Sequence, residues 1–276
     1  MKTREVVASA TRMLRDAGVA SPEVDARLII EHVLSCERLM WPSEIDDEQY
    51  RAIARLVRQR AERIPLQHLL GVMWFLDFAL EARPGVFCVR PETEVLAERL
   101  QRWCLDHPGA RILDLCTGSG AIAIAAARAD HRAEVSAVDI SARAIASAQR
   151  NAQHLGVSVD WHCVDAGDTV TGWIEYFDVV VSNPPYIPRR DLDPEALADP
   201  PAALWGGGED GLEIPRIIID QATRYLRPGG WMMVEHDDTQ AEALADHART
   251  LGLATIQTVP DLAGRPRFLT ASKMGQ

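Results

Sequence analysis

The chain has 276 residues, of which 47% are hydrophobic and 25% are charged, and its formal net charge is -11. A chain of this length and composition can form a globular catalytic domain with a smaller companion domain. Its acidic balance argues against tight nucleic-acid binding, and no apolar run approaches the ~20 residues that span a bilayer.

The cysteine and histidine spacings match none of the common disulfide or metal patterns. The five cysteines are widely spaced and form no C-x-x-C pair, and the eight histidines include no H-E-x-x-H motif. Residues 1–18 are charged throughout and lack the apolar core of a signal peptide. We therefore predict a cytoplasmic, monomeric protein that holds no metal and does not bind a membrane.

Amphipathic helices are expected in the first part of the chain. Apolar residues recur at spacings of three and four over residues 3–17, and a second apolar stripe follows Ser21, which is placed as an N-cap. A third helix is expected over about residues 47–63, before Pro65. These helices predict a small bundle over residues 1–70. Its arginines Arg55, Arg58, Arg60 and Arg63 are expected to be solvated, although they could contact an acidic partner or ribosomal RNA bound with it.

Residues 71–90 are expected to form a β-hairpin that links two domains. β-forming residues flank Arg83-Pro84-Gly85, a triplet typical of turns. A helix is then expected to begin near Pro91.

From residue 111 onward, short apolar strands alternate with helices. This alternation predicts an α/β fold, a Rossmann-like, doubly wound parallel sheet over residues 91–276. A further antiparallel pair is expected over residues 254–272, at the edge of the sheet. The parallel strands are expected within residues 111–115, 133–140, 159–166, 177–182 and 231–236.

The first of these strands runs into a glycine-rich turn, D-L-C-T-G-S-G, at residues 114–120. Glycines without a Cβ allow a ligand to approach the backbone closely. Dinucleotide sites use G-x-G-x-x-G, whose third glycine is Ala123 here. Asp114 would repel a pyrophosphate, but it suits the sulfonium and ammonium groups of S-adenosylmethionine. The turn therefore favours that cofactor, and a plain strand-to-helix turn is the alternative.

Acidic residues follow the next two strands. A carboxylate at Asp139 could accept hydrogen bonds from both hydroxyls of a ribose, although it could instead cap the following helix. Asp165, with Ala166 beside it, could bind an adenine amino group, or it could be an ordinary loop acid. Together these residues indicate a cofactor that contains a nucleoside.

The fourth parallel strand ends in N-P-P-Y, residues 183–186. The side-chain oxygen of Asn183 and the carbonyl of Pro184 are two acceptors, and Tyr186 adds a flat ring, a set that fits a planar –NH₂ group. Hydrogen bonds from both N–H groups to fixed acceptors would orient such a nitrogen and raise its electron density during methyl transfer. A proline-rich strand exit with an incidental tyrosine is the alternative.

These motifs, with I-P-L-Q-H-L-L-G, R-P-E-T-E, A-L-W-G-G-G-E-D-G-L and D-L-A-G-R-P-R, resemble those of the release-factor glutamine methyltransferases, the PrmC or HemK group. The resemblance runs from about residue 20 to residue 276. It implies a class I methyltransferase domain joined to a helical substrate-recognition domain. It also implies transfer of a methyl group from S-adenosylmethionine to the side-chain nitrogen (N5) of the glutamine in the Gly-Gly-Gln loop of a peptide-chain release factor.

The resemblance also assigns roles to residues of this chain. Asn183, Pro184 and Tyr186 would be catalytic. The glutamine would be held by Asn183, Pro184, Pro185, Tyr186, Arg90, Glu92 and Thr93. The cofactor would be held by Asp114, Cys116, Thr117, Gly118, Ser119, Gly120, Asp139, Ile140, Asp165, Ala166 and Asn183.

The chain departs from the family pattern at Cys88-Val89, Asp199-Pro200 and Trp205, all on the expected substrate side. These departures motivate a second hypothesis, methylation of an amide or guanidine nitrogen of a small metabolite. A third hypothesis is an adenine acceptor in nucleic acid, which the net charge disfavours. A fourth is a protein that binds the cofactor without turnover, which Asn183 and Tyr186 disfavour.

Overall fold

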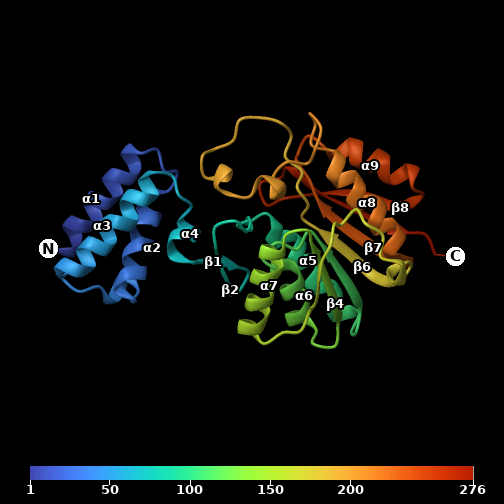
Figure 1. The fold of residues 1–276 in the computed structure, drawn as a ribbon, viewed down its shortest axis with the longest axis horizontal. Helices are drawn as coiled ribbons and strands as arrows, with labels where there is room; N and C mark the ends of the chain where they lie inside the picture. Colours follow the sequence, from blue (N-terminus) through green and yellow to red (C-terminus); the bar gives the residue numbers. More distant parts are fainter. Residues whose placement is uncertain (276) are drawn as a thin grey trace. The chain divides into compact units, whose positions relative to one another are not determined.

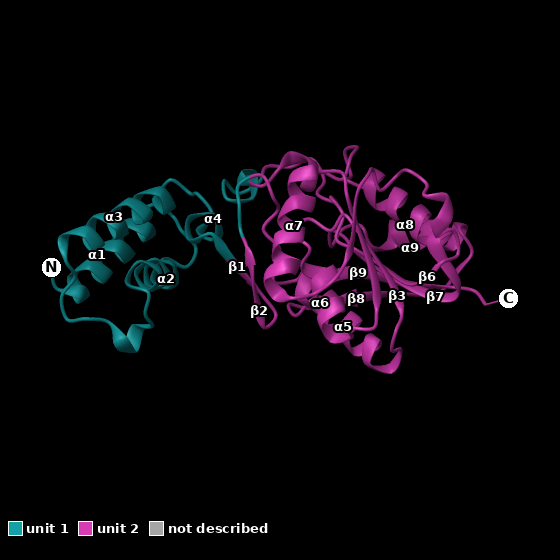
Figure 2. Cartoon of the chain, turned by 60° about the horizontal axis from the view of Figure 1, so that its bottom comes forward, with its two compact units in different colours: residues 1–72, 82–84, 192–198 teal, residues 73–81, 85–191, 199–276 magenta. Residues whose placement is uncertain are grey.

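The computed structural model describes residues 1–275, which divide into two compact units (Figure 2). Unit 1 contains residues 1–72, 82–84 and 192–198, and unit 2 contains the other described residues. Each unit has a hydrophobic core of its own. None of the helices in the described part of the chain is both long enough and apolar enough to span a membrane.

Unit 1 is a bundle of helices, as the apolar spacing predicts. Val6, Leu14, Ile29, Ile53 and Val57 are among the side chains that fill its core. The third helix starts with a capping box, in which the Asp46 carboxylate accepts hydrogen bonds from two backbone N–H groups. A short helix after Pro65 is an addition to the expected set. The helices are α1 (Thr3–Asp16), α2 (Pro22–Leu34), α3 (Asp47–Ala61) and α4 (Leu66–Leu70), with a 3₁₀ turn at Arg38–Met40.

The prediction that Arg60 and Arg63 lie on a solvated face is wrong. Arg60 is buried, and its Nε donates a hydrogen bond to Asp25 Oδ2 at 2.6 Å. The Glu195 carboxylate forms ion pairs with both arginines, at 2.9 Å from Arg60 Nη2 and 2.8 Å from Arg63 Nε. Sequence spacing missed this arrangement because the carboxylate of Glu195 comes from a segment more than a hundred residues away. Arg55 and Arg58 are exposed, as predicted.

The hairpin is present, but its predicted turn is wrong. Strands β1 (Val72–Phe75) and β2 (Phe78–Glu81) are joined at Leu76 and Asp77. Leu76 takes φ = 52°, and its N–H donates to Glu94 Oε1 at 2.9 Å. Leucine is a poor turn former, so a tertiary hydrogen bond stabilises a turn that the local pattern does not predict. Pro84 and Gly85 form a later bend.

Unit 2 is built on a seven-stranded sheet within residues 1–275, with strand order β5-β4-β3-β6-β7-β9-β8. The first five strands in that order are parallel, and β9 and β8 are antiparallel at the edge, as expected. The strands are β3 (Arg111–Leu115), β4 (Glu134–Asp139), β5 (Asp160–Cys163), β6 (Phe177–Ser182), β7 (Leu226–Glu235), β8 (Leu253–Pro260) and β9 (Pro266–Lys273).

Alternating side chains of these strands form two separate hydrophobic layers. Leu113, Val180 and Met232 pack on one face with residues of the last two helices, whereas Ile112 and Val179 pack on the other with α5 and α6. Figure 1 shows α8 and α9 together on one side of the sheet and α5 to α7 on the other. The helices are α5 (Thr93–Asp106), α6 (Ala121–Ala129), α7 (Ala142–Leu155), α8 (Glu213–Tyr225) and α9 (Ala241–Thr250).

Strand β7 begins earlier than its apolar core suggests. The R-P-G-G segment, residues 227–230, already belongs to the strand, and the pairing with β6 shifts register beside it. A Cβ on Gly230 would lie 2.9 Å from the backbone oxygen of Asp178. The glycine therefore allows two strand backbones to approach each other closely.

Candidate active site

The glycine-rich turn after β3 brings two strand ends together. Thr117 N donates to Val138 O at 2.9 Å, and Gly118 N donates to Asp139 Oδ2 at 2.8 Å. Cys116, Gly118 and Gly120 all have positive φ, which places the chain in a sharp turn before α6. A Cβ on Gly118 would meet no heavy atom within 4 Å, so the backbone at this point is open to a ligand.

Asp114 differs from its predicted role as a surface for the cofactor's positive groups. Its side chain is fully buried, and Oδ2 accepts hydrogen bonds from Thr117 Oγ1 at 2.6 Å and Ala123 N at 3.2 Å. Burial raises the pKa of this carboxyl to about 7, and the two hydrogen bonds oppose that rise. Asp114 therefore supports the turn from inside the protein.

Asp139 lies at the end of β4, where the sequence places it, and is half-buried. Its two oxygens accept hydrogen bonds from Gly118 N and Ser141 N, each at 2.8 Å. Helix α7 is capped by the Ser141 hydroxyl, which accepts from Ala144 N, so Asp139 is not the N-cap. Each carboxylate oxygen keeps a lone pair for a further donor, which suits the two hydroxyls of a ribose. Burial raises the pKa of Asp139.

The remaining residues of the predicted cofactor set differ in exposure. Ile140 is 63% exposed directly after Asp139, and Asp165 is exposed beyond the end of β5. Asp165 Oδ1 accepts from Gly167 N at 2.8 Å, and Ala166 packs against the core. Because Cys163 pairs with Asp139 in the sheet, this corner follows the neighbouring strand at the same edge.

The N-P-P-Y turn follows β6 and is held rigidly. Gln240 Nε2 donates to Tyr186 O at 2.8 Å, and Ile187 N donates to Leu204 O at 2.9 Å. A Cβ on Gly211 would come within 2.5 Å of Tyr186 O, so only glycine allows this close packing. Pro184 is buried, whereas Asn183 and Tyr186 are partly exposed. The turn therefore presents its polar groups from a fixed backbone.

A hydrogen-bonded network lies behind Asn183. Its Nδ2 donates to Thr93 Oγ1 at 2.9 Å, and Thr93 Oγ1 donates to Glu235 Oε2 at 2.8 Å. Tyr186 OH donates to the other oxygen of Glu235 at 2.9 Å. Thr93, predicted to line the substrate pocket, is fully buried and supports Asn183 instead. With Nδ2 turned toward Thr93, Oδ1 of Asn183 points the other way, as an acceptor.

Glu235 is a site residue that the sequence reasoning missed. It is fully buried at the end of β7, and burial raises its pKa to about 7 despite the bonds from Thr93 and Tyr186. Burial also raises the pKa of Tyr186 well above its ordinary value, so this phenol stays protonated. The available signal was an acid directly following the apolar run W-M-M-V, at the carboxyl edge of a buried strand.

The R-P-E-T-E segment is tied to a position where the chain departs from the family pattern. Arg90 Nη2 forms an ion pair with Asp199, whose Oδ1 accepts from Cys88 N at 3.0 Å. Cys88 and Asp199 are both buried, and burial raises the pKa of the Cys88 thiol to about 12. Two of the departures therefore contact each other. Glu92 lies 3.6 Å from Arg265.

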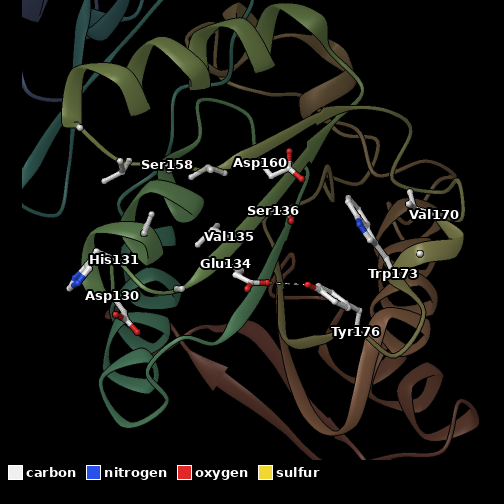
Figure 3. Close-up of a pocket in the computed structure, with 16 residues that line it drawn as sticks. Asp130, His131, Glu134, Val135, Ser136, Ser158, Asp160, Val170, Trp173 and Tyr176 are labelled. Carbon is white, nitrogen blue, oxygen red and sulfur yellow. Dashed lines mark hydrogen bonds between the residues drawn. The ribbon is translucent and has the colours of Figure 1, made fainter.

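Unit 2 has a hollow of about 910 Å³ away from these residues, and Figure 3 draws the residues that line it. It lies at the amino end of β4, near Asp130, Glu134 and Trp173. Tyr176 OH donates to Glu134 Oε2 at 3.0 Å across it. Within the described residues, its lining contains none of the predicted site residues, because those follow the opposite ends of the strands.

Comparisons with known proteins cover the whole chain. The model of the "Methyltransferase small domain" family matches residues 77–250, and that of the "PrmC N-terminal domain" matches residues 5–71. Among curated proteins, the release factor glutamine methyltransferase of Mycolicibacterium smegmatis is 42% identical, over 100% of this chain and 99% of the relative. The release factor glutamine methyltransferase of Corynebacterium glutamicum is 41% identical, over 98% of both chains.

Among solved structures, the T. thermophilus 16S rRNA N2 G1207 methyltransferase is similar in fold. It has a TM-score of 0.55 and 23% identity, over 73% of this chain and 49% of that chain. This likeness supports the Rossmann-like α/β fold described above.

Proposed function

Because the chain belongs to the release factor glutamine methyltransferase family, we propose that it methylates the side-chain amide nitrogen of a glutamine in a peptide-chain release factor, with S-adenosylmethionine as the donor. We place this glutamine in the Gly-Gly-Gln loop. The observation that carries the proposal is the orientation of Asn183, whose Oδ1 is turned away from Thr93 and can accept from an amide N–H.

The residues around the glycine-rich turn fit the cofactor. The backbone at Gly118 is open, and the Asp139 carboxylate has lone pairs left for ribose hydroxyls. Ile140 offers an exposed apolar surface to a base, and Asp165 with Ala166 lies at the adjoining strand end. When bound, S-adenosylmethionine supplies a methyl group on a positively charged sulfur.

The protein's contribution to the reaction is positioning. An amide nitrogen is a poor nucleophile because its lone pair is delocalised into the carbonyl. Asn183 Oδ1 and the Pro184 carbonyl would accept from its two N–H groups, and the ring of Tyr186 would hold the amide plane. Such fixed acceptors align the lone pair and stabilise the positive charge that develops on nitrogen as the methyl group arrives. The nitrogen then loses a proton to water.

Mass spectrometry of a purified release factor after incubation with the protein and S-adenosylmethionine tests the proposal. We expect one added methyl group on the glutamine of the Gly-Gly-Gln loop. Asn183→Ala should lose turnover while its affinity for the cofactor stays within a few-fold. A correctly folded release factor that remains unmodified by the wild-type protein would reject the proposal. Methylation of a free amino acid or small amide in the same assay would favour the small-metabolite hypothesis.

The helical domain, residues 1–70, is proposed as the part that recognises the release factor. The family model of the PrmC N-terminal domain matches residues 5–71. On the loop before α3, the side chains of Leu39 and Met40 are 95% and 75% exposed. Large apolar side chains held in solvent on one loop suit a protein partner. Replacing both by serine should raise KM for the intact release factor and leave turnover of a short Gly-Gly-Gln peptide unchanged.

A further inference from the structure

Three hydrogen bonds connect the N-P-P-Y turn to a buried acid. They run from Asn183 Nδ2 to Thr93, from Thr93 to Glu235 Oε2, and from Tyr186 OH to Glu235 Oε1. Thr93 and Glu235 are both fully buried. Neither side chain can therefore contact a substrate directly.

The direction of these bonds follows from counting hydrogens. A threonine hydroxyl has one hydrogen and two lone pairs, and an ionised carboxylate only accepts. When Thr93 donates to Glu235, only its lone pairs remain for Asn183. The Asn183 amide must then turn its NH₂ group toward Thr93, because the opposite orientation would set two acceptors against each other.

The two orientations of an asparagine amide have nearly the same shape, so packing alone distinguishes them poorly. In one orientation Asn183 presents an acceptor to the substrate, and in the other it presents a donor. A substrate –NH₂ group requires the acceptor. The catalytic geometry therefore depends on the orientation of the Asn183 amide, which neither the backbone nor the volume of the side chain determines.

We propose that Thr93 and Glu235 are positioning residues, which fix the orientation of the Asn183 amide through the single hydrogen of the Thr93 hydroxyl. This inference rests on the proposed function of the site and adds the residues that set its acceptor. Asn183 touches the substrate, whereas Thr93 and Glu235 act through it.

The hydrogen bonds among Asn183, Thr93 and Glu235 also depend on the ionisation of Glu235. The groups that face this carboxyl are Thr93 on α5, Tyr186 in the turn, Arg267 on β9, and Glu92 at a longer range. Burial dominates them and places the pKa of Glu235 at about 7. A proton on Oε2 leaves the Tyr186 bond intact and makes Glu235 a donor to Thr93. The Thr93 hydrogen is then free to bond Asn183 Oδ1, which reverses the amide.

The test compares Thr93→Val with Thr93→Ser in the full-length protein, using a release factor as substrate. Valine keeps the shape of threonine without the hydroxyl, and serine keeps the hydroxyl. We expect kcat to fall about 100-fold in Thr93→Val and to stay within a few-fold of wild type in Thr93→Ser. The Kd for S-adenosylmethionine, measured by calorimetry, should stay within about twofold in both variants, because Thr93 is not among the residues that would hold the cofactor.

Thr223→Val is the matched control, because it removes a threonine hydroxyl that donates to Ile219 O within α8 of the same unit. It should lower the thermal unfolding midpoint slightly and leave kcat unchanged. A Thr93→Val protein that binds cofactor normally and turns over at the wild-type rate would overturn the inference. An inactive wild-type protein would instead count against the proposed function itself.

A pH profile of kcat adds a readout that a purely structural role would not change. In the wild type, kcat should fall as the pH is lowered through about 7, since protonated Glu235 reverses the amide. In Thr93→Val this decrease should disappear, because the proton on Glu235 no longer reaches Asn183. A decrease in kcat with the same midpoint pH in both proteins would show that Thr93 does not couple the protonation of Glu235 to the orientation of Asn183.

Discussion

The two glycines of the turn after β3 should give opposite defects when each is replaced by alanine. Gly120 has φ = 85°, and a Cβ there would lie 2.9 Å from Trp161 Cη2 and 3.0 Å from Ala148 Cβ. Gly118 has φ = 57°, and a Cβ there would meet nothing within 4 Å. Gly120 is therefore confined by the protein, whereas Gly118 faces the proposed cofactor.

The magnitudes follow from these contacts. A left-handed backbone conformation costs alanine about 1–2 kcal/mol relative to glycine at either position. Overpacking adds about 1–3 kcal/mol at Gly120, because a tryptophan ring and a helix must shift. The expected loss in unfolding free energy is thus about 2–5 kcal/mol for Gly120→Ala and about 1–2 kcal/mol for Gly118→Ala.

Urea unfolding and calorimetric titration with S-adenosylmethionine separate the two effects. Gly120→Ala should have the clearly lower unfolding midpoint. Gly118→Ala should remain folded, but its new methyl group should weaken cofactor binding by at least about tenfold, which corresponds to 1.4 kcal/mol. Equal losses of stability in the two variants, or wild-type affinity of Gly118→Ala for S-adenosylmethionine, would contradict these assignments of the two glycines.

Three further predictions concern individual carboxylates. Asp139→Ala should weaken S-adenosylmethionine binding about tenfold or more in calorimetry, because the ribose hydroxyls lose a charged acceptor. Unchanged binding would show that Asp139 does not belong to the cofactor site. Asp114 has a folded pKa of about 7, above its ordinary value, so the folded state keeps a proton that the unfolded state loses as pH rises from about 4 to 7. The free energy of unfolding should therefore fall over that window by roughly 1.4 kcal/mol per pH unit for this group. Asp114→Asn should remove this contribution and leave those of Glu235 and Asp139, whose pKa values are also raised. Asp25→Ala should destabilise unit 1 by up to about 3–5 kcal/mol, because it leaves Arg60 buried with Glu195 as its remaining carboxylate partner. Glu31→Ala breaks the more exposed pair with Arg27, and it should cost less than about 1 kcal/mol in the same denaturation experiment.

Sequence patterns predicted the fold well, because they record local requirements. Alternating strands and helices gave the order of elements in unit 2, and the apolar spacing gave the helices of unit 1. Strand ends in a parallel sheet meet at one edge, so Gly118, Asp139 and Asn183 could be assigned to one region before the structure was known.

Sequence patterns were less informative about which groups pair with each other. Asp114 was predicted to face the positive groups of the cofactor, and its side chain is fully buried, since strand periodicity does not show which acid turns inward. Glu235 follows an apolar run, with nothing near it in the chain to indicate a network. Its partners Thr93 and Tyr186 lie 142 and 49 residues away in the chain. Only the fold brings them within hydrogen-bonding distance of Glu235.

The chain crosses between the two units after residues 72, 81, 84, 191 and 198. Segment 192–198 is inserted between β6 and α8, yet its Glu195 neutralises Arg60 and Arg63 of the helical bundle. A chimera that exchanges only the first 72 residues between two relatives would therefore separate Arg60 and Arg63 from the Glu195 carboxylate of this chain. An exchange of unit 1 between relatives would have to transplant its three discontinuous pieces together.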